Sequence, residues 1–224
     1  MQIKSKVRLK TLTQTFLWNE LIIDIVLVKS KKTTKIVIIG AGGFGREALW
    51  TILDCNKISK EFEILGFIDD NKQLYGKKIN NIPVLGTTDW LVSELEDQVG
   101  CIIAVGDCKI RKKISSKLAN KNFKFPSIIH PTALCYDLAN IGQGTIIQAG
   151  SIISVDVKVG NFSYINYGCT IGHDSKIGDY VTLSPGVHIS GTNVVEEGVF
   201  VGTGTVTKQN ISIGKWSFIG GGTV

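Results

Sequence analysis

Residues 170–179, "TIGHDSKIGD", contain two aliphatic residues six positions apart, Ile171 and Ile177, each followed by glycine. The period continues in both directions. Counting in sixes from Ile141 to Ile219 gives fourteen positions, of which thirteen are aliphatic and one is Thr207, and the frame extends back through Cys135 to Ile129. A period of six suits neither an α-helix nor an isolated pair of strands. It predicts a solenoid of short parallel strands whose aliphatic side chains stack in an interior column.

A second position of each six-residue unit is also restricted. Four residues after each aliphatic residue stands a small or β-branched residue, to which Asn193 is the nearest exception. In this frame His173 occupies the third place of its unit, where we expect a corner that points away from the column. Asp174 follows it directly. Because a single histidine is more often exposed or structural than catalytic, the pattern alone assigns this pair no activity.

Upstream of the repeat, apolar segments alternate with helical patterns. "KIVIIGAGGFGREALWTIL" (35–53) predicts a buried strand, a glycine turn and an amphipathic helix, and "EILGFIDD" (63–70) predicts a strand that ends in two acids. "CIIAVG" (101–106) predicts a third strand, followed by a basic helix in "DCKIRKKISSKLAN". This alternation favours a parallel α/β sheet. We therefore predict three parts: an extension of unknown role (1–34), a small α/β domain (35–126) and the repeat domain (127–224).

The glycine turn has the spacing GxGxxG, formed by Gly40, Gly42 and Gly45. Such glycines bring backbone N–H groups close to a phosphate at the start of the following helix. One alternative is an NAD site with Asp69 or Asp70 on the ribose, although the domain has only one mononucleotide-sized half. Another is that the glycines serve only strand–helix packing.

Charge and cysteine content exclude several classes of protein. Residues 1–34 carry a net charge of +5, so the other 190 residues carry only +1 of the total of +6, which is too little for a broad nucleic-acid-binding surface. The five cysteines are scattered without a CxxC pair, which argues against a zinc ribbon or a disulfide framework and favours a reducing, cytoplasmic setting. The apolar run "LIIDIVLV" (21–28) is too short to span a membrane and lacks the features of a signal peptide.

Five segments together carry a resemblance to a known family. "IGAGGFGRE", "GFIDD", "IAVGDCKIRKKI", "IIHPTA" and "IGHDSKIGDY", in this order, resemble the NeuD/PglD-like bacterial sugar acetyltransferases, which are hexapeptide-repeat acyltransferases. The resemblance covers residues 35–224. It implies a Rossmann-like nucleotide-sugar domain, a left-handed parallel β-helix with three hexads per coil, and a homotrimer with active sites between neighbouring coils. It further implies acetyl-CoA as co-substrate and a UDP-linked 4-amino sugar, used for surface glycans, as acceptor.

The resemblance also implies roles for individual residues. His173 is matched to the general base, Asp174 to the acid that raises its basicity, and Gly191 to the backbone donor for the oxyanion. The residues matched to nucleotide-sugar contacts are Gly42, Gly43, Phe44, Asp69, Asp70 and Gly106. The residues matched to acetyl-CoA contacts are Thr182, Thr203 and Gly221. Thr182 stands where some members have histidine.

Three alternatives remain open at this point. The same base and thioester would serve O-acetylation of a sugar hydroxyl, as in the sialic acid O-acetyltransferases. The sequence given ends at "IGGGTV", whereas relatives continue into a tail that helps to cover CoA, so a non-catalytic nucleotide-sugar-binding protein is a second alternative. Zinc held by His130, His173 and His188 is a third, but the last two are fifteen residues apart without an HxxxxH motif, and we expect no metal.

Overall fold

A computed structural model describes residues 33–95, 99–119, 121–137 and 139–224 of the chain. Residues 33–224 form one compact unit. The predicted N-terminal extension and its apolar run lie outside the described residues, apart from Thr33 and Thr34. Within the described part of the chain, no helix is long and apolar enough to cross a bilayer.

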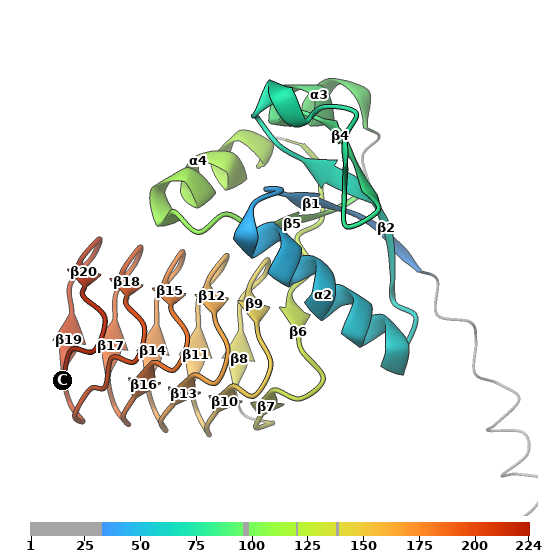
Figure 1. Cartoon of the computed structure of the whole chain (residues 1–224). Helices are drawn as coiled ribbons and strands as arrows, with labels where there is room; N and C mark the ends of the chain where they lie inside the picture. Colours follow the sequence, from blue (N-terminus) through green and yellow to red (C-terminus); the bar gives the residue numbers. More distant parts are fainter. Residues whose placement is uncertain (1–32, 96–98, 120, 138) are drawn as a thin grey trace, which may run out of the picture. The chain divides into compact units, whose positions relative to one another are not determined.

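The first half of this unit is a five-stranded sheet with helices, as predicted (Figure 1). The strand order is β3-β4-β2-β1-β5, and β1 pairs in parallel with both β2 and β5. The strands are β1 (Thr34–Ile39), β2 (Phe62–Ile68), β3 (Lys78–Ile79), β4 (Ile82–Gly86) and β5 (Gly100–Ile103). The helices are α2 (Gly43–Ile58), α3 (Thr88–Glu94) and α4 (Cys108–Leu118), with a 3₁₀ turn at Lys72–Leu74.

The segment between β2 and β5 was not resolved into elements by the sequence analysis. It holds the antiparallel hairpin of β3 and β4, whose two-residue turn is Asn80-Asn81. Both asparagines have positive φ, 49° and 66°, which suits the two-residue turns that match strand twist. Helix α3 follows at once, and the Thr87 hydroxyl caps it by accepting a hydrogen bond from the N–H of Trp90.

The second half is a parallel β-helix of two-residue strands, which confirms the fold predicted from the period of six. Its strands form three sheets, and paired strands lie eighteen residues apart in the sequence. The first sheet contains β6 (Ile128–Ile129), β9 (Ile146–Ile147), β12 (Tyr164–Ile165), β15 (Thr182–Leu183), β18 (Phe200–Val201) and β20 (Phe218–Ile219). The second contains β7 (Leu134–Cys135), β10 (Ile152–Ile153), β13 (Thr170–Ile171) and β16 (His188–Ile189). The third contains β8 (Asn140–Ile141), β11 (Lys158–Val159), β14 (Lys176–Ile177), β17 (Val194–Val195) and β19 (Ser212–Ile213).

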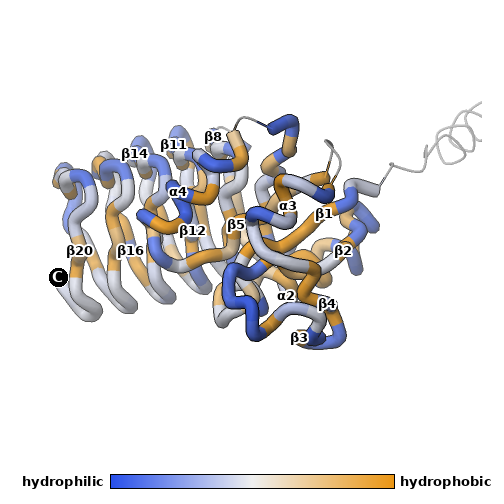
Figure 2. Tube along the Cα trace, turned by 90° about the horizontal axis from the view of Figure 1, so that it is seen from above, coloured by the Kyte–Doolittle hydropathy of each residue, from blue (hydrophilic) through white to orange (hydrophobic). Residues whose placement is uncertain are grey.

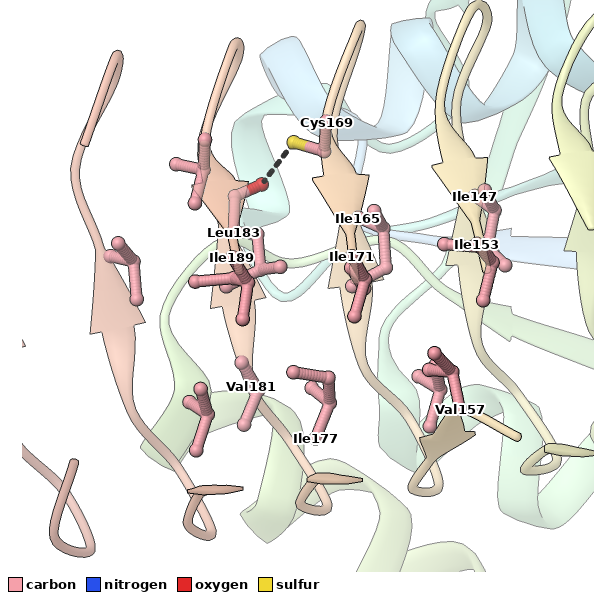
Figure 3. Close-up of a cluster of buried hydrophobic side chains, with 14 of the residues drawn as sticks. Ile147, Ile153, Val157, Ile165, Cys169, Ile171, Ile177, Val181, Leu183 and Ile189 are labelled. Carbon is pink, nitrogen blue, oxygen red and sulfur yellow. Dashed lines mark hydrogen bonds between the residues drawn. The ribbon is translucent and has the colours of Figure 1, made fainter. Parts of the chain in front are cut away.

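The interior column consists of the second residue of each strand (Figure 3). The members from Ile147 to Val201 are buried and pack together with Val157, Val181 and Cys169 from the other restricted position. The two exceptions to the sequence pattern, Asn193 and Thr207, are hydrogen-bonded to each other. The Asn193 amide donates to the Thr207 hydroxyl at 2.6 Å and to the Lys208 carbonyl at 2.9 Å. Ile129, at the first coil, is 37% exposed because no coil precedes it in the column.

The corners of the β-helix are equally regular, since every sixth residue from Gly144 to Gly222 has positive φ. Each of the three edges has its own chemistry. The glycine edge comprises Gly150, Gly168, Gly186, Gly204 and Gly222; the polar edge comprises Asp156, Asp174, Thr192 and Asn210; the aromatic edge comprises Gly144, Phe162, Tyr180, Gly198 and Trp216. Gly, Asn and Asp adopt this conformation most readily, which explains the glycine edge and the polar edge apart from Thr192. On the aromatic edge, Phe162 and Tyr180 stack with centroids 5.5 Å apart.

The three faces of the β-helix differ in what covers them. On the first sheet the outward residues Ile128, Ile146, Tyr164 and Thr182 are buried, because residues of α2 and α4 pack there. The outward residues of the second sheet include Leu134, Ile152 and Val206, which are apolar and exposed. Those of the third sheet include Lys158 and Lys176. Figure 2 shows apolar residues recurring along the coils. Among the described residues nothing covers the second sheet, and we call it the uncovered apolar face, although Thr170 and His188 are polar residues within it.

Candidate functional site

His173 and Asp174 lie on the polar edge, between β13 and β14, with their side chains 50% and 57% exposed. The left-handed conformation of Asp174 (φ 60°) lets its carboxylate meet the preceding ring, and His173 Nδ1 lies 2.8 Å from Asp174 Oδ2. A carboxylate only accepts, so this bond keeps the proton of a neutral imidazole on Nδ1. The lone pair of Nε2 is then free to act as a base.

Gly191 lies one coil further along the same edge, directly against the imidazole. A Cβ at this position would lie 2.6 Å from His173 Nε2, so any residue other than glycine would displace the ring from its present position. Within the described part of the chain, the N–H of Gly191 donates no hydrogen bond. The structure thus brings His173, Asp174 and Gly191 together, with an unpaired N–H donor beside the basic nitrogen.

The glycine turn leads into α2, and no side chain caps the N-terminus of this helix. Gly40 has φ 103° and a Cβ there would lie 2.6 Å from the Ala104 carbonyl oxygen, so this position requires glycine. Gly42 is the N-cap of α2 and offers no side-chain hydrogen bond, while Gly42 and Gly43 are exposed with open space around them. Free N–H groups at the start of a sixteen-residue helix suit an anion.

The two acids after β2 have local hydrogen-bonding roles. Asp69 accepts from the N–H of Ala41 at 2.8 Å and from that of Asn71 at 2.9 Å, so it ties the glycine turn to β2. Asp70 accepts from the N–H of Thr88 at 2.8 Å, at the start of α3. Asp69 therefore shapes the turn that the sequence analysis assigned to the substrate, and direct contact of either acid with a ligand stays a prediction.

A cavity of about 520 Å³ lies between the starts of α2 and α4 and the last coils of the β-helix. Phe44 and Gly106, two of the predicted substrate residues, are in its wall. The ring of Phe44 is held against Tyr164, with centroids 4.5 Å apart. The complete lining is Phe44, Gly106, Asp107, Cys108, Lys109, Gly198, Phe200, Trp216, Ser217 and Phe218.

The aromatic wall of this cavity was not predicted from the sequence. Phe200 and Phe218 stand in outward positions of successive coils and stack with centroids 4.9 Å apart and planes at 2°. Trp216 belongs to the aromatic edge, and the Lys112 ammonium lies 5.2 Å from the centre of its ring. The eighteen-residue spacing of Phe200 and Phe218 was the available signal, because it places both on one face of the β-helix.

The residues matched to acetyl-CoA contacts separate into two places. Thr203 and Gly221 are exposed at neighbouring positions of successive coils, beside the glycine edge. Thr182 is fully buried, and its hydroxyl accepts from Arg111 Nη2 at 2.9 Å and lies 3.4 Å from Cys108 Sγ. A coenzyme would reach this hydroxyl only if α4 moved away, so the geometry gives the Thr182 contact no support.

The three histidines have separate local partners. His130 lies 3.2 Å from Asp54 and 2.9 Å from the Thr132 hydroxyl, and His188 lies 2.9 Å from the Thr170 hydroxyl. Hydrogen bonds from Lys57 and then from His130 lower the pKa of Asp54. Among the described residues, no three His, Cys, Asp or Glu side chains gather into a metal-binding group.

The His173 site and the cavity occupy different parts of the chain. None of the residues that line the cavity belongs to the polar edge, and neither His173 nor Gly191 is among them. The candidate general base, His173, therefore does not line this cavity within the described part of a single chain.

A parallel β-helix with an exposed His–Asp pair at a corner, next to an α/β domain with a glycine turn, defines a hexapeptide-repeat acyltransferase architecture. Comparison with known families agrees: residues 35–118 match the PglD N-terminal domain and residues 156–191 match the bacterial transferase hexapeptide (six repeats). The chain belongs to the family of PglD-like hexapeptide-repeat acetyltransferases.

Three relatives make this likeness specific. The acetyltransferase domain of PglB from Neisseria gonorrhoeae FA1090, solved in complex with acetyl coenzyme A, is 33% identical with a TM-score of 0.77, over 86% of this chain and 90% of that one. GDP-perosamine N-acetyltransferase of Escherichia coli O157:H7 is 35% identical over 128 residues, 56% of each chain. UDP-N-acetylbacillosamine N-acetyltransferase of Bacillus subtilis (strain 168) is 35% identical over 116 residues, 51% of each. The chain thus spans about half the length of these two curated relatives.

Proposed function

We propose that the protein transfers the acetyl group of acetyl-CoA to the amino group of a nucleotide-linked sugar. One observation carries the proposal: the imidazole of His173 is oriented by Asp174 through its Nδ1, and Gly191 lies against its Nε2. A base, its orienting carboxylate and an N–H donor are the groups that acyl transfer to an amine requires.

The chemistry follows from this arrangement. As the sugar amine attacks the thioester carbonyl, Nε2 of His173 accepts its proton and Asp174 stabilises the resulting imidazolium. The negative charge that develops on the carbonyl oxygen is stabilised by a backbone N–H, for which Gly191 is our candidate. Collapse of the tetrahedral intermediate breaks the carbon–sulfur bond, and the imidazolium returns the proton to the departing CoA thiolate.

The nucleotide part of the acceptor is proposed to bind in the α/β half. The open N-terminus of α2 suits a diphosphate, with Gly42 and Gly43 exposed to receive it. The adjacent cavity, walled by Phe44, Trp216 and Phe218, suits a planar base. Relatives named for GDP-linked and UDP-linked sugars support a nucleotide-sugar acceptor, and the UDP-linked 4-amino sugar remains our preferred one.

We further propose that the active protein is a cytoplasmic homotrimer. The uncovered apolar face borders the polar edge, because β13 leads directly into the corner that holds His173. Packing this face against a second copy would bury it and give the exposed dyad a second wall. Such an arrangement also offers a way to bring the cavity of one copy to the histidine of another.

The test is CoA release from acetyl-CoA, measured as free thiol with UDP- and GDP-linked 4-amino sugars and with sialic acid. We expect thiol release with a nucleotide-linked amino sugar. Release only with sialic acid would favour O-acetylation. Tight nucleotide-sugar binding without thiol release would favour a non-catalytic binding protein, and tight NAD binding in calorimetry would favour a dinucleotide site.

A further inference from the structure

Arg111 is a charged residue in the interior. It lies on α4, is 1% exposed, and is among the largest fully buried side chains. Among the described residues it takes part in no salt bridge with a carboxylate. Burial of a cation costs free energy, and accordingly burial lowers the pKa of Arg111, although a guanidinium stays protonated in proteins. We therefore expect the buried Arg111 guanidinium to have a function that offsets this cost.

The guanidinium is satisfied almost entirely by backbone carbonyls from two separate places. Nη1 donates to the Val105 carbonyl at 2.7 Å and to that of Gly106 at 3.2 Å. Nε donates to the Phe162 carbonyl at 2.7 Å, and Nη2 donates to the Tyr180 carbonyl at 2.7 Å and to the Thr182 hydroxyl at 2.9 Å. The first pair belongs to the loop after β5, and the others belong to two successive coils of the β-helix.

These two places continue into the opposite walls of the cavity. The loop held by Nη1 runs on through Gly106 and Asp107 to Cys108, which form one wall. The aromatic edge held by Nε and Nη2 runs on through Gly198 and Trp216, which form the other. Because the guanidinium is planar and its donors are fixed in direction, it sets the spacing of the walls more rigidly than a flexible side chain could.

The distance between the two walls also affects Phe44, a predicted substrate contact, through Gly106. A Cβ on Gly106 would lie 3.0 Å from the ring of Phe44, so the loop is already in close contact with the aromatic ring on α2. Any shift of the loop would move Phe44 or open the cavity between them.

We infer that Arg111 is a positioning residue for the nucleotide cavity: it holds the loop at Val105 and Gly106 against the β-helix and so fixes the pocket for the nucleotide part of the acceptor. This inference rests on the proposed function. It assigns Arg111 no contact with the reacting atoms. Its effect is on affinity for nucleotide and not on acetyl-CoA binding.

The test compares Arg111→Lys, Arg111→Met and the control Lys113→Met, which removes an exposed charge from the same helix. UDP and GDP are the probes, with Kd values from calorimetry, alongside acetyl-CoA affinity and Tm. We expect Arg111→Lys to weaken binding of the preferred nucleotide at least about tenfold, because lysine has three donors and no planar fork. Acetyl-CoA affinity should stay within about twofold, the lysine control should behave as wild type, and Arg111→Met should be weaker still.

The other outcomes of this experiment would overturn the inference. A lower Tm in Arg111→Lys with unchanged nucleotide affinity would make Arg111 purely structural and overturn the inference. An equal loss of nucleotide and acetyl-CoA affinity would mean general disruption and would also overturn it. If Arg111→Met does not fold, Arg111→Lys alone decides by the same criteria. Failure of the wild type to bind UDP or GDP would instead refute the nucleotide part of the proposed function, and this inference with it.

Discussion

At the scale of single residues, backbone geometry brings the side chains of His173 and Asp174 together. Asp174 adopts positive φ at a corner, and this turns its carboxylate toward the ring of the preceding residue. Adjacent residues on an extended segment face apart, so the contact depends on the corner. From the sequence we could predict only that His173 points outward. Its contacts with Asp174 and with Gly191 follow from the geometry of the coil and could not be predicted.

We expect His173→Ala to lower the turnover number about 10²–10⁴-fold, the usual contribution of a positioned base. Its side chain is half exposed and lies outside the interior column, so Tm should be unchanged. Turnover and melting temperature are measured on the same preparation. Unchanged turnover would make His173 an ordinary surface residue.

Two companion variants sharpen this experiment. Asp174→Asn keeps a residue that tolerates positive φ, so the fold should persist while turnover falls less than in His173→Ala. His130→Ala is the matched control. The His130 ring contacts Asp54 and Thr132, and neither residue belongs to the polar edge. The substitution should lower Tm and leave turnover unchanged. Turnover lost in His130→Ala and kept in His173→Ala would contradict the assignment of His173 as the general base.

At the scale of the elements, the six-residue unit determines both the strand and the corner. The aliphatic period predicted the column correctly because a buried aliphatic leaves a strict sequence signal at every coil. The aromatic edge gave no such signal, since Phe162, Tyr180 and Trp216 stand at corners where glycine or asparagine is usual. Their contacts with the α/β half are long-range and could not be predicted from a local period.

Two glycines of the β-helix, Gly168 and Gly178, should respond differently to alanine. Gly168 has φ 63° and open space around it, so Gly168→Ala should cost about 1–2 kcal/mol through backbone strain alone. At Gly178 a Cβ would lie 2.7 Å from the backbone nitrogen of Glu197 in the next coil, so Gly178→Ala must push coils apart and should cost more.

Chemical denaturation of the two variants measures the difference in free energy of unfolding. Gly168→Asn is the control, and it should recover most of the loss because asparagine accepts the left-handed region. Equal destabilisation by both alanines would show that coil spacing is less rigid than the backbone contacts indicate.

At the scale of the whole molecule, the parallel α/β sheet and the β-helix followed from the sequence, whereas the junction between them did not. Arg111 was visible only as part of a basic helix. Its position among Cys108, Ile114 and Leu118, at the helical spacing of a buried face, was the overlooked signal. A domain boundary at residue 126 stays a prediction, and apolar contacts cross it, for Ile146 and Tyr164 share one cluster with α2.

The uncovered apolar face gives the assembly prediction. Sedimentation equilibrium should show a trimer for the wild type, and Ile152→Lys should dissociate it because a charge would enter a contact now 41% exposed and apolar. The variant should keep its circular dichroism and its affinity for UDP or GDP but lose turnover. Lys176→Ala, on the third face, should remain trimeric. A wild type that is monomeric at micromolar concentration would refute the homotrimer.

The eighteen-residue coil restricts how such a gene can change in length. Hydrogen bonds between coils recur at this separation, as from Thr170 to His188, so a chain lengthened or shortened by one whole coil keeps every residue on its own edge. Loss of a single codon inside a strand would instead shift every downstream residue by one place, moving the column aliphatics to the outward strand position and the residues that follow them into the column. Viable variants of this half of the protein should therefore differ in length by whole coils, that is, by steps of three times eighteen nucleotides.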